Sequence, residues 1–166
     1  MGGKAGRMLG AAGFTLLYPL FAPLLSNVPN PMVPGAIVAL HLTFPVMAGF
    51  FYGPVSGAVA GGAGTALAWL VWRGPFDLLA VLPHLCMGLL AGLLGRTGSE
   101  FITSLAVVPG HLLNMVFFMA FGAMVIEPHM WGLTILGLAT ESTMDIVIVI
   151  LVCGQFKARL YSEERL

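Results

Sequence analysis

Six apolar segments, separated by short turns rich in Gly, Pro and Asn, constrain the fold of this chain more than any other feature. A helix needs about 20 residues to cross the hydrocarbon core of a bilayer, and each segment is close to that length. The short connections indicate that consecutive helices are antiparallel neighbours. The predicted spans are residues 8–25, 33–52, 54–72, 78–95, 101–126 and 130–153.

The composition supports a membrane protein. Of the 166 residues, 58% are hydrophobic and 8% are charged, whereas roughly a quarter of the residues in a soluble domain are charged. Strand-type alternation is absent, which favours helices over a β-barrel. We therefore predict an all-α integral membrane protein in which residues 1–166 form one compact six-helix bundle. A formal net charge of zero and the absence of a basic run argue against nucleic acid as a partner.

The basic residues predict the orientation of the chain in the membrane. Six spans place both termini on one side, and with cytoplasmic termini only Arg73 of the seven Lys and Arg residues lies outside. This agrees with the positive-inside rule and predicts a multi-pass protein of the cell membrane. The run after Lys4 and Arg7 lacks a signal-peptide cleavage site, so we interpret it as an uncleaved first span. The basic residues predicted inside are Lys4, Arg7, Arg96, Lys157, Arg159 and Arg165.

Small residues recur at four-residue spacing in several spans. Such lines let helix backbones approach closely in lipid, so we expect most of them to pack helices within the chain. Docking to a separate membrane subunit is the alternative. The glycine lines are Gly53/Gly57/Gly61, Gly88/Gly92 and Gly2/Gly6/Gly10.

Two carboxylates lie inside the last apolar segment. A carboxylate at the centre of a bilayer costs about 2.5–3.5 kcal/mol, so Glu141 and Asp145 need a compensating role. They share one helix face with Thr134 and Leu138. Because like charges on one face repel, they require a proton, a His partner or a cationic ligand.

Four other polar side chains lie at depth in the predicted spans. His111 and Asn114 are three residues apart and point the same way, and His41 and His84 stand singly. Counting from the outer end of each span places His41 and His84 outermost, Asn114 and Glu141 near the middle, and His111 and Asp145 deeper. A structural hydrogen bond to a neighbouring helix is the alternative role for each His. We expect these groups to share one outward-opening cavity, with the candidate substrate-binding residues His41, His84, His111, Asn114, Glu141 and Asp145.

Other chemistries have weaker support in the sequence. Three His and two carboxylates would suit a first-row divalent metal, but no HxxxH or HExxH spacing fixes two ligands on one helix turn. The metal question therefore stays open. No GxSxG or other nucleophile motif occurs, so we expect neither an enzyme nor a cofactor. Cys86 and Cys153 lack CxxC spacing and are interpreted as packing residues.

Residues 40–61, with the sequence LHLTFPVMAGFFYGPVSGAVAG, combine an apolar helix, a tight Gly53-Pro54 turn and a Gly/Ala-rich helix. This block resembles the second-to-third helix region of the substrate-binding S components of energy-coupling factor (ECF) vitamin transporters. Chain length, six spans, cytoplasmic termini and sparse charge also match that family. The resemblance is detailed over this block and architectural elsewhere.

The resemblance implies capture of a vitamin or similar micronutrient from the outer side. The protein would then dock on a transmembrane coupling subunit driven by two ATPase subunits. It also implies a ligand site near His84, His111, Asn114 and Glu141, with the loop of residues 26–31 as a lid.

The docking motif of the family departs from its pattern in this chain. The family docks through an AxxxA line on the first helix, but here Ala5 is followed by Leu9, and Ala12 by Leu16. Gly6 and Gly10 could substitute for the missing alanines. The coupling partner is therefore left open.

The leading hypothesis is a substrate-binding component of an ATP-driven uptake system for a vitamin-like or cationic small molecule. An acid-rich lining favours a ligand with an amine, a cationic ring or a metal. The chain has no P-loop, so energy must come from another polypeptide or an ion gradient. One alternative is a stand-alone proton-coupled permease for a metal or organic cation, with Glu141 and Asp145 as the proton-linked groups. A second is a structural or assembly subunit of a membrane complex.

Overall fold

The computed structural model describes residues 4–34, 36–74 and 77–163. In these ranges the chain is almost entirely helical, with one short antiparallel hairpin in which Val28 pairs with Val38. The α-helices are α1 (Lys4–Leu25), α2 (Thr43–Tyr52), α3 (Pro54–Trp72), α4 (Asp77–Leu94), α5 (Glu100–Ser104), α6 (Val107–Ala120) and α7 (Trp131–Glu163). The remaining elements are β1 (Val28–Pro29), β2 (Ile37–Val38) and the 3₁₀ turns η1 (Leu40–Leu42), η2 (Gly95–Thr97) and η3 (Pro128–Met130).

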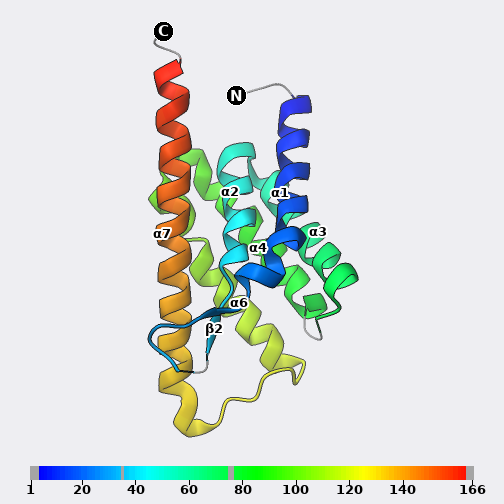
Figure 1. The fold of residues 1–166 in the computed structure, drawn as a ribbon, viewed down its shortest axis with the longest axis vertical. Coiled ribbons are helices and arrows are strands. Elements are labelled where there is room, and N and C mark those ends of the chain that lie inside the picture. Colours follow the sequence, from blue (N-terminus) through cyan, green and yellow to red (C-terminus); the bar gives the residue numbers. More distant parts are fainter. Residues whose placement is uncertain (1–3, 35, 75–76, 164–166) are drawn as a thin grey trace.

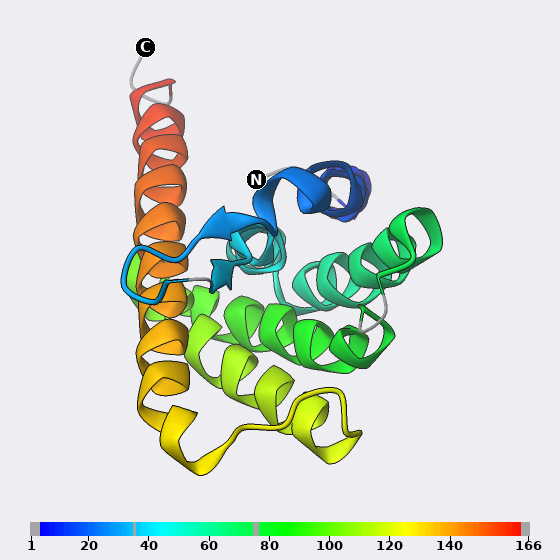
Figure 2. The ribbon, with the colours of Figure 1, turned by 60° about the horizontal axis from the view of Figure 1, so that its bottom comes forward.

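The helices form a bundle around the α3–α4 pair. α3 also contacts α1 and α2, and α4 contacts α2 and α6. The long helix α7 runs along one side of the bundle, and the start of α1 and the end of α7 lie at the same end of the molecule (Figure 1). The hairpin and the α6–α7 connection lie at the opposite end (Figures 1 and 2).

Glycines allow α3 and α4 to touch through their backbones. A Cβ atom on Gly57 would overlap the carbonyl of Gly88, and one on Gly88 would overlap the carbonyl of Gly57. Gly61 faces the carbonyl of His84 in the same way, and Gly92 faces the backbone of Pro54. The prediction that these lines pack helices within the chain is confirmed at these positions.

The glycine line at the start of the chain behaves differently. Gly10 packs against the ring of Tyr52 on α2, so it serves the fold of the chain itself. A Cβ on Gly6 would meet no atom within 4 Å. Gly2, like Arg165, lies outside the described residues.

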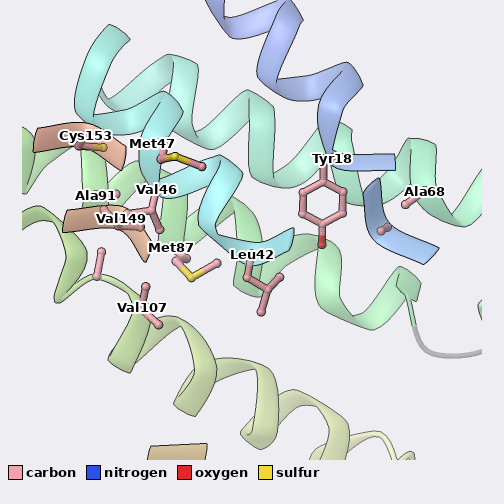
Figure 3. Close-up of a cluster of buried hydrophobic side chains, with 12 residues drawn as sticks. Tyr18, Leu42, Val46, Met47, Ala68, Met87, Ala91, Val107, Val149 and Cys153 are labelled. Atoms are coloured by element: carbon pink, nitrogen blue, oxygen red, sulfur yellow. The ribbon is translucent and has the colours of Figure 1, made fainter. Parts of the chain in front are cut away.

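The hydrophobic core lies where α2, α4, α6 and α7 meet. Val46, Met87, Val107 and Val149 are buried there and form one cluster (Figure 3). Tyr18 of α1 belongs to the same cluster, and its hydroxyl also takes part in the polar site described below.

Two predicted spans agree closely with the structure. The span of residues 54–72 coincides with α3, which begins at Pro54 because Pro is favoured in the first helical turn. The span of residues 78–95 matches α4 within a residue at each end.

The predicted second span is wrong in its first half. Residues 33–34 and 36–42 form an irregular loop with β2 and η1, and His41 lies on η1 rather than on a long helix. Asn30 explains the local fold, because its Oδ1 accepts hydrogen bonds from the N–H groups of Met32 (2.9 Å) and Val33 (3.1 Å). Such side-chain bonds offer the backbone an alternative to helix, and the position before Pro34 also disfavours the helical region.

The last two predicted spans also differ from the structure. The span of residues 101–126 is interrupted between α5 and α6 and ends at Ala120, with Gly122 (φ +69°) in the left-handed region that stops a helix. α7 is 33 residues long and extends well past residue 153. Lys157 ties this extension to the start of α5, because its Nζ contacts Glu100 Oε1 (3.0 Å) and donates to the carbonyl oxygen of Gly98 (2.7 Å).

Within the described residues, five helical stretches are long and apolar enough to cross a membrane. The stretch Leu40–Tyr52 is apolar but shorter. An integral membrane protein rich in helices is thus what the structure supports, and the count of six spans stays a prediction.

Candidate substrate-binding site

A cavity of about 840 Å³ lies between the first loop, described for residues 26–34 and 36–42, and the helices α1, α3, α4, α6 and α7. It occupies the end of the bundle that carries the hairpin and the α6–α7 connection (Figure 1). Cavities that hold small molecules commonly measure about 300–1,000 Å³ and combine apolar walls with a few polar groups. Both properties apply here.

The first loop covers the cavity and is attached to α7 by two side chains. Asn30 Nδ2 donates to the carbonyl oxygen of Gly137 (3.2 Å) while its Oδ1 holds the turn described above. Glu141 Oε1 accepts a hydrogen bond from the backbone N–H of Ala39 (2.8 Å). A charge-assisted bond of this kind is about twice as strong as a neutral one, so Glu141 is a principal anchor of the loop.

A polar cluster lies on the α1–α3–α4 side of the cavity. Nδ1 of His84 lies 2.9 Å from the hydroxyl of Tyr18 and 2.9 Å from Oγ1 of Thr65. His41 packs edge-on against the Tyr18 ring, with centroids 4.8 Å apart. Nε2 of His84 and Nδ1 of His41 are buried, and neither has a hydrogen-bond partner in the described part of the chain.

A second polar cluster joins α6 to α7. Nδ1 of His111 lies 2.9 Å from Oγ of Ser142, and Nε2 of His111 lies 3.4 Å from Oδ2 of Asp145. Asp145 is fully buried and is not among the residues that line the cavity. It contacts His111, which does line it. Asn114 lines the cavity one turn away, with a buried Oδ1 that lacks a partner among the described residues.

Large apolar side chains form the remaining wall. Trp72 is positioned by its indole Nε1–H, which donates to the carbonyl oxygen of Pro19 (2.8 Å). That carbonyl would normally accept the N–H four residues later, but Pro23 has none, so the carbonyl within α1 is left free to accept from Trp72. The large apolar residues that line the cavity include Trp72, Met115, Phe118, Met124 and Met130.

The described residues that line the cavity carry few charged groups. The lining residues include no Lys or Arg, and Glu141 is the one carboxylate among them. Its Oε1 is engaged by Ala39, which offsets part of the cost of burying it. In the described part of the chain, no group of three or more His, Cys, Asp or Glu side chains is arranged to hold a metal ion.

Five of the six predicted site residues therefore line one cavity, and the sixth, Asp145, contacts the fifth-span residue His111 as the depth count predicts. Sequence reasoning missed Asn30, Tyr18, Thr65 and Trp72. Thr65 could have been found, because Thr65 and Ser56 are the two polar residues of a helix that otherwise carries Gly, Pro and apolar residues. Asn30 gave no such signal, since it sits in a turn sequence where Asn is ordinary.

A comparison with known protein families shows to which family the chain belongs. Residues 17–157 match the family described as "ECF-type riboflavin transporter, S component". The chain belongs to this family. No curated protein and no solved structure matches the chain significantly.

The resemblance to S components is thus confirmed over most of the chain. As an S component, the protein is a multi-pass membrane protein of a transport system, and the substrate-binding subunit of that system. The cavity beneath the first loop is the candidate site for that substrate.

Proposed function

We propose that this S component captures riboflavin, or an uncharged vitamin of similar shape, and delivers it to an ATP-driven coupling complex. The observation that carries the proposal is the cavity of about 840 Å³, which is walled by aromatic and Met side chains and lined by a few polar groups. A flat ring system suits such a wall, since aromatic contacts and polarizable Met sulfur both favour stacked rings. The family name supports the same class of ligand.

The charges favour a neutral ligand over the cationic one expected from the sequence. Asp145 lies outside the lining, and Glu141 already accepts the N–H of Ala39. A phosphorylated ligand is disfavoured as well, because no Lys or Arg among the lining residues could balance its charge. The substrate is therefore the free vitamin rather than an anionic derivative.

We assign distinct roles to the polar residues. His41, His84, His111 and Asn114 contact the substrate, and Glu141 borders the site while it anchors the first loop as a lid. Asp145 is a positioning residue that acts through His111. The contacts that support these roles are Glu141–Ala39 at 2.8 Å and His111–Asp145 at 3.4 Å.

The proposal also covers orientation and partners. With cytoplasmic termini, the cavity opens on the outer face of the membrane, at the end opposite the start of α1 and the end of α7. A transmembrane coupling subunit and two ATPase subunits then supply the energy. On α1, Leu9 and Leu16 are exposed and Gly6 is open, so this helix offers the coupling subunit a surface of different shape from AxxxA.

Flavin fluorescence titration of the detergent-purified protein tests the proposal. We expect saturable riboflavin binding that Asn114→Leu weakens and that Val116→Ala, a change at an exposed position of the same helix, leaves unchanged. In liposomes the isolated protein should bind without transporting. Riboflavin transport by the isolated protein under a pH gradient would support a permease instead, and neither binding nor transport would support an assembly subunit.

A further inference from the structure

We propose that His84 selects the substrate by accepting a hydrogen bond, through Nε2, from a hydroxyl or N–H group of the bound molecule. The proposal rests on the proposed function, because it concerns the same cavity. It adds a chemical requirement on the ligand: the edge that faces α1, α3 and α4 must carry a donor.

The contacts of Thr65 fix the position of the proton on His84. Oγ1 of Thr65 lies 2.6 Å from the carbonyl oxygen of Gly61. Two oxygen atoms approach this closely with a proton between them, and a carbonyl has none, so the Thr65 hydroxyl donates to Gly61. The same Oγ1 lies 2.9 Å from Nδ1 of His84, and this contact also needs a proton. Because the hydroxyl proton is already used, the second proton must be on Nδ1.

The other neighbours of the ring agree with this tautomer. The hydroxyl oxygen of Tyr18 lies 2.9 Å from the same Nδ1, so the Nδ1–H group is shared between two oxygens in a three-centre bond. A neutral imidazole carries one proton, which leaves Nε2 as a bare acceptor. A doubly protonated ring would require a carboxylate partner, but Glu141 contacts Ala39 and Asp145 contacts His111.

Nε2 lacks the partner that a buried acceptor needs. His84 is 4% exposed, and its Nε2 has no hydrogen-bond partner among the described residues. Leaving a buried acceptor unsatisfied is unfavourable, and such atoms in native proteins usually have a reason. Because His84 lines the cavity, a molecule within it can supply the missing donor. In riboflavin the available donors are the ribityl hydroxyls and the N–H of the isoalloxazine ring.

Nitrogen-15 NMR of protein labelled at His tests the tautomer without any ligand. We expect a protonated Nδ1 and a bare Nε2 at His84. Thr65→Val should shift the proton toward Nε2, since the Tyr18 hydroxyl can then donate to Nδ1, whereas Thr65→Ser should leave the tautomer unchanged. A wild-type His84 protonated at Nε2 would overturn the proposal whatever the ligand is.

Binding of three flavins tests the contact itself. The probes are riboflavin, 3-methylriboflavin, which lacks the ring N–H, and lumiflavin, which lacks the ribityl chain. His84→Phe should weaken riboflavin binding at least about tenfold, and weaken the analogue without the contacted donor by less than about twofold. Thr65→Val should follow His84→Phe, and Thr65→Ser should stay within about twofold of wild type.

The outcomes separate this proposal from the proposed function. An equal loss for all three flavins, or no loss for riboflavin, would show that Nε2 receives no donor and would overturn the proposal. If the wild-type protein does not bind riboflavin, the substrate assignment is wrong, and the NMR result alone decides the role of His84.

Discussion

At the scale of single residues, the pair of His111 and Asp145 places two titratable side chains in the buried interior of the bundle. Asp145 is fully buried, and its ion-pair partner in the described part of the chain is Nε2 of His111, 3.4 Å from Oδ2. The other ring nitrogen of His111, Nδ1, lies 2.9 Å from Oγ of Ser142. Removing one member of a buried pair leaves the other charge uncompensated, which costs about 3–5 kcal/mol, whereas replacing both with apolar groups is often neutral.

This asymmetry gives a prediction. Asp145→Leu alone should lower the unfolding temperature in detergent markedly, because it leaves His111 buried without its partner. The double variant His111→Phe/Asp145→Leu should recover more than half of that loss. A thermal unfolding series on the two single variants and the double variant measures the coupling, and strictly additive shifts would contradict a paired role.

At the scale of elements, the α3–α4 contact depends on the absence of side chains. A Cβ on Gly57 would overlap the Gly88 carbonyl, and helix backbones cannot move apart there without losing the packing around them. Overpacking typically costs about 1–3 kcal/mol, and here the obstacle is backbone, which cannot change rotamer.

We therefore expect Gly57→Ala to destabilise the protein by at least about 2 kcal/mol. Gly154→Ala is the matched control, because a Cβ there meets nothing within 4 Å on a helix, where Ala is favoured over Gly. Unfolding temperature and yield of monodisperse protein report the effect. Equal behaviour of the two variants would show that the close backbone contact is unimportant.

The first loop is the second element whose position has a defined cause. In the described part of the chain, the Asn30 side chain makes three hydrogen bonds, one to Gly137 on α7 and two within the loop. Glu141 adds one more from α7 to Ala39. Two side chains, Asn30 from the loop and Glu141 from α7, therefore hold the first loop against α7.

Removal of the Asn30 bonds should free the loop. We predict that Asn30→Ala raises hydrogen–deuterium exchange across residues 26–42 and speeds ligand release at least about tenfold, because each lost bond to a buried group costs about 1–3 kcal/mol. Asn27→Ala is the control, since Asn27 is in the same loop but its side chain makes an exposed hydrogen bond, from Nδ2 to the Pro23 carbonyl (3.0 Å). Unchanged exchange in the Asn30 variant would contradict the lid role.

At the scale of the whole molecule, apolar segment length predicted α3 and α4 closely, because lipid forces each spanning helix to satisfy its own backbone. The same reasoning failed for residues 33–42, where Asn30 and the prolines direct the chain into a loop that is held by α7. Side-chain faces and depth predicted that His41, His84, His111, Asn114 and Glu141 share a cavity. Partners such as Thr65 and Ser142 depend on how helices pack, which one sequence does not encode locally.

The central claim is that the cavity of this S component holds one neutral flavin-class vitamin. Native mass spectrometry of the intact protein, saturated with an equimolar mixture of riboflavin and its 5′-phosphate and then released from detergent, tests it most directly. We predict one riboflavin per chain and a large preference over the phosphate, because none of the described residues that line the cavity is Lys or Arg. Equal retention of both ligands, or retention of neither, would contradict the account.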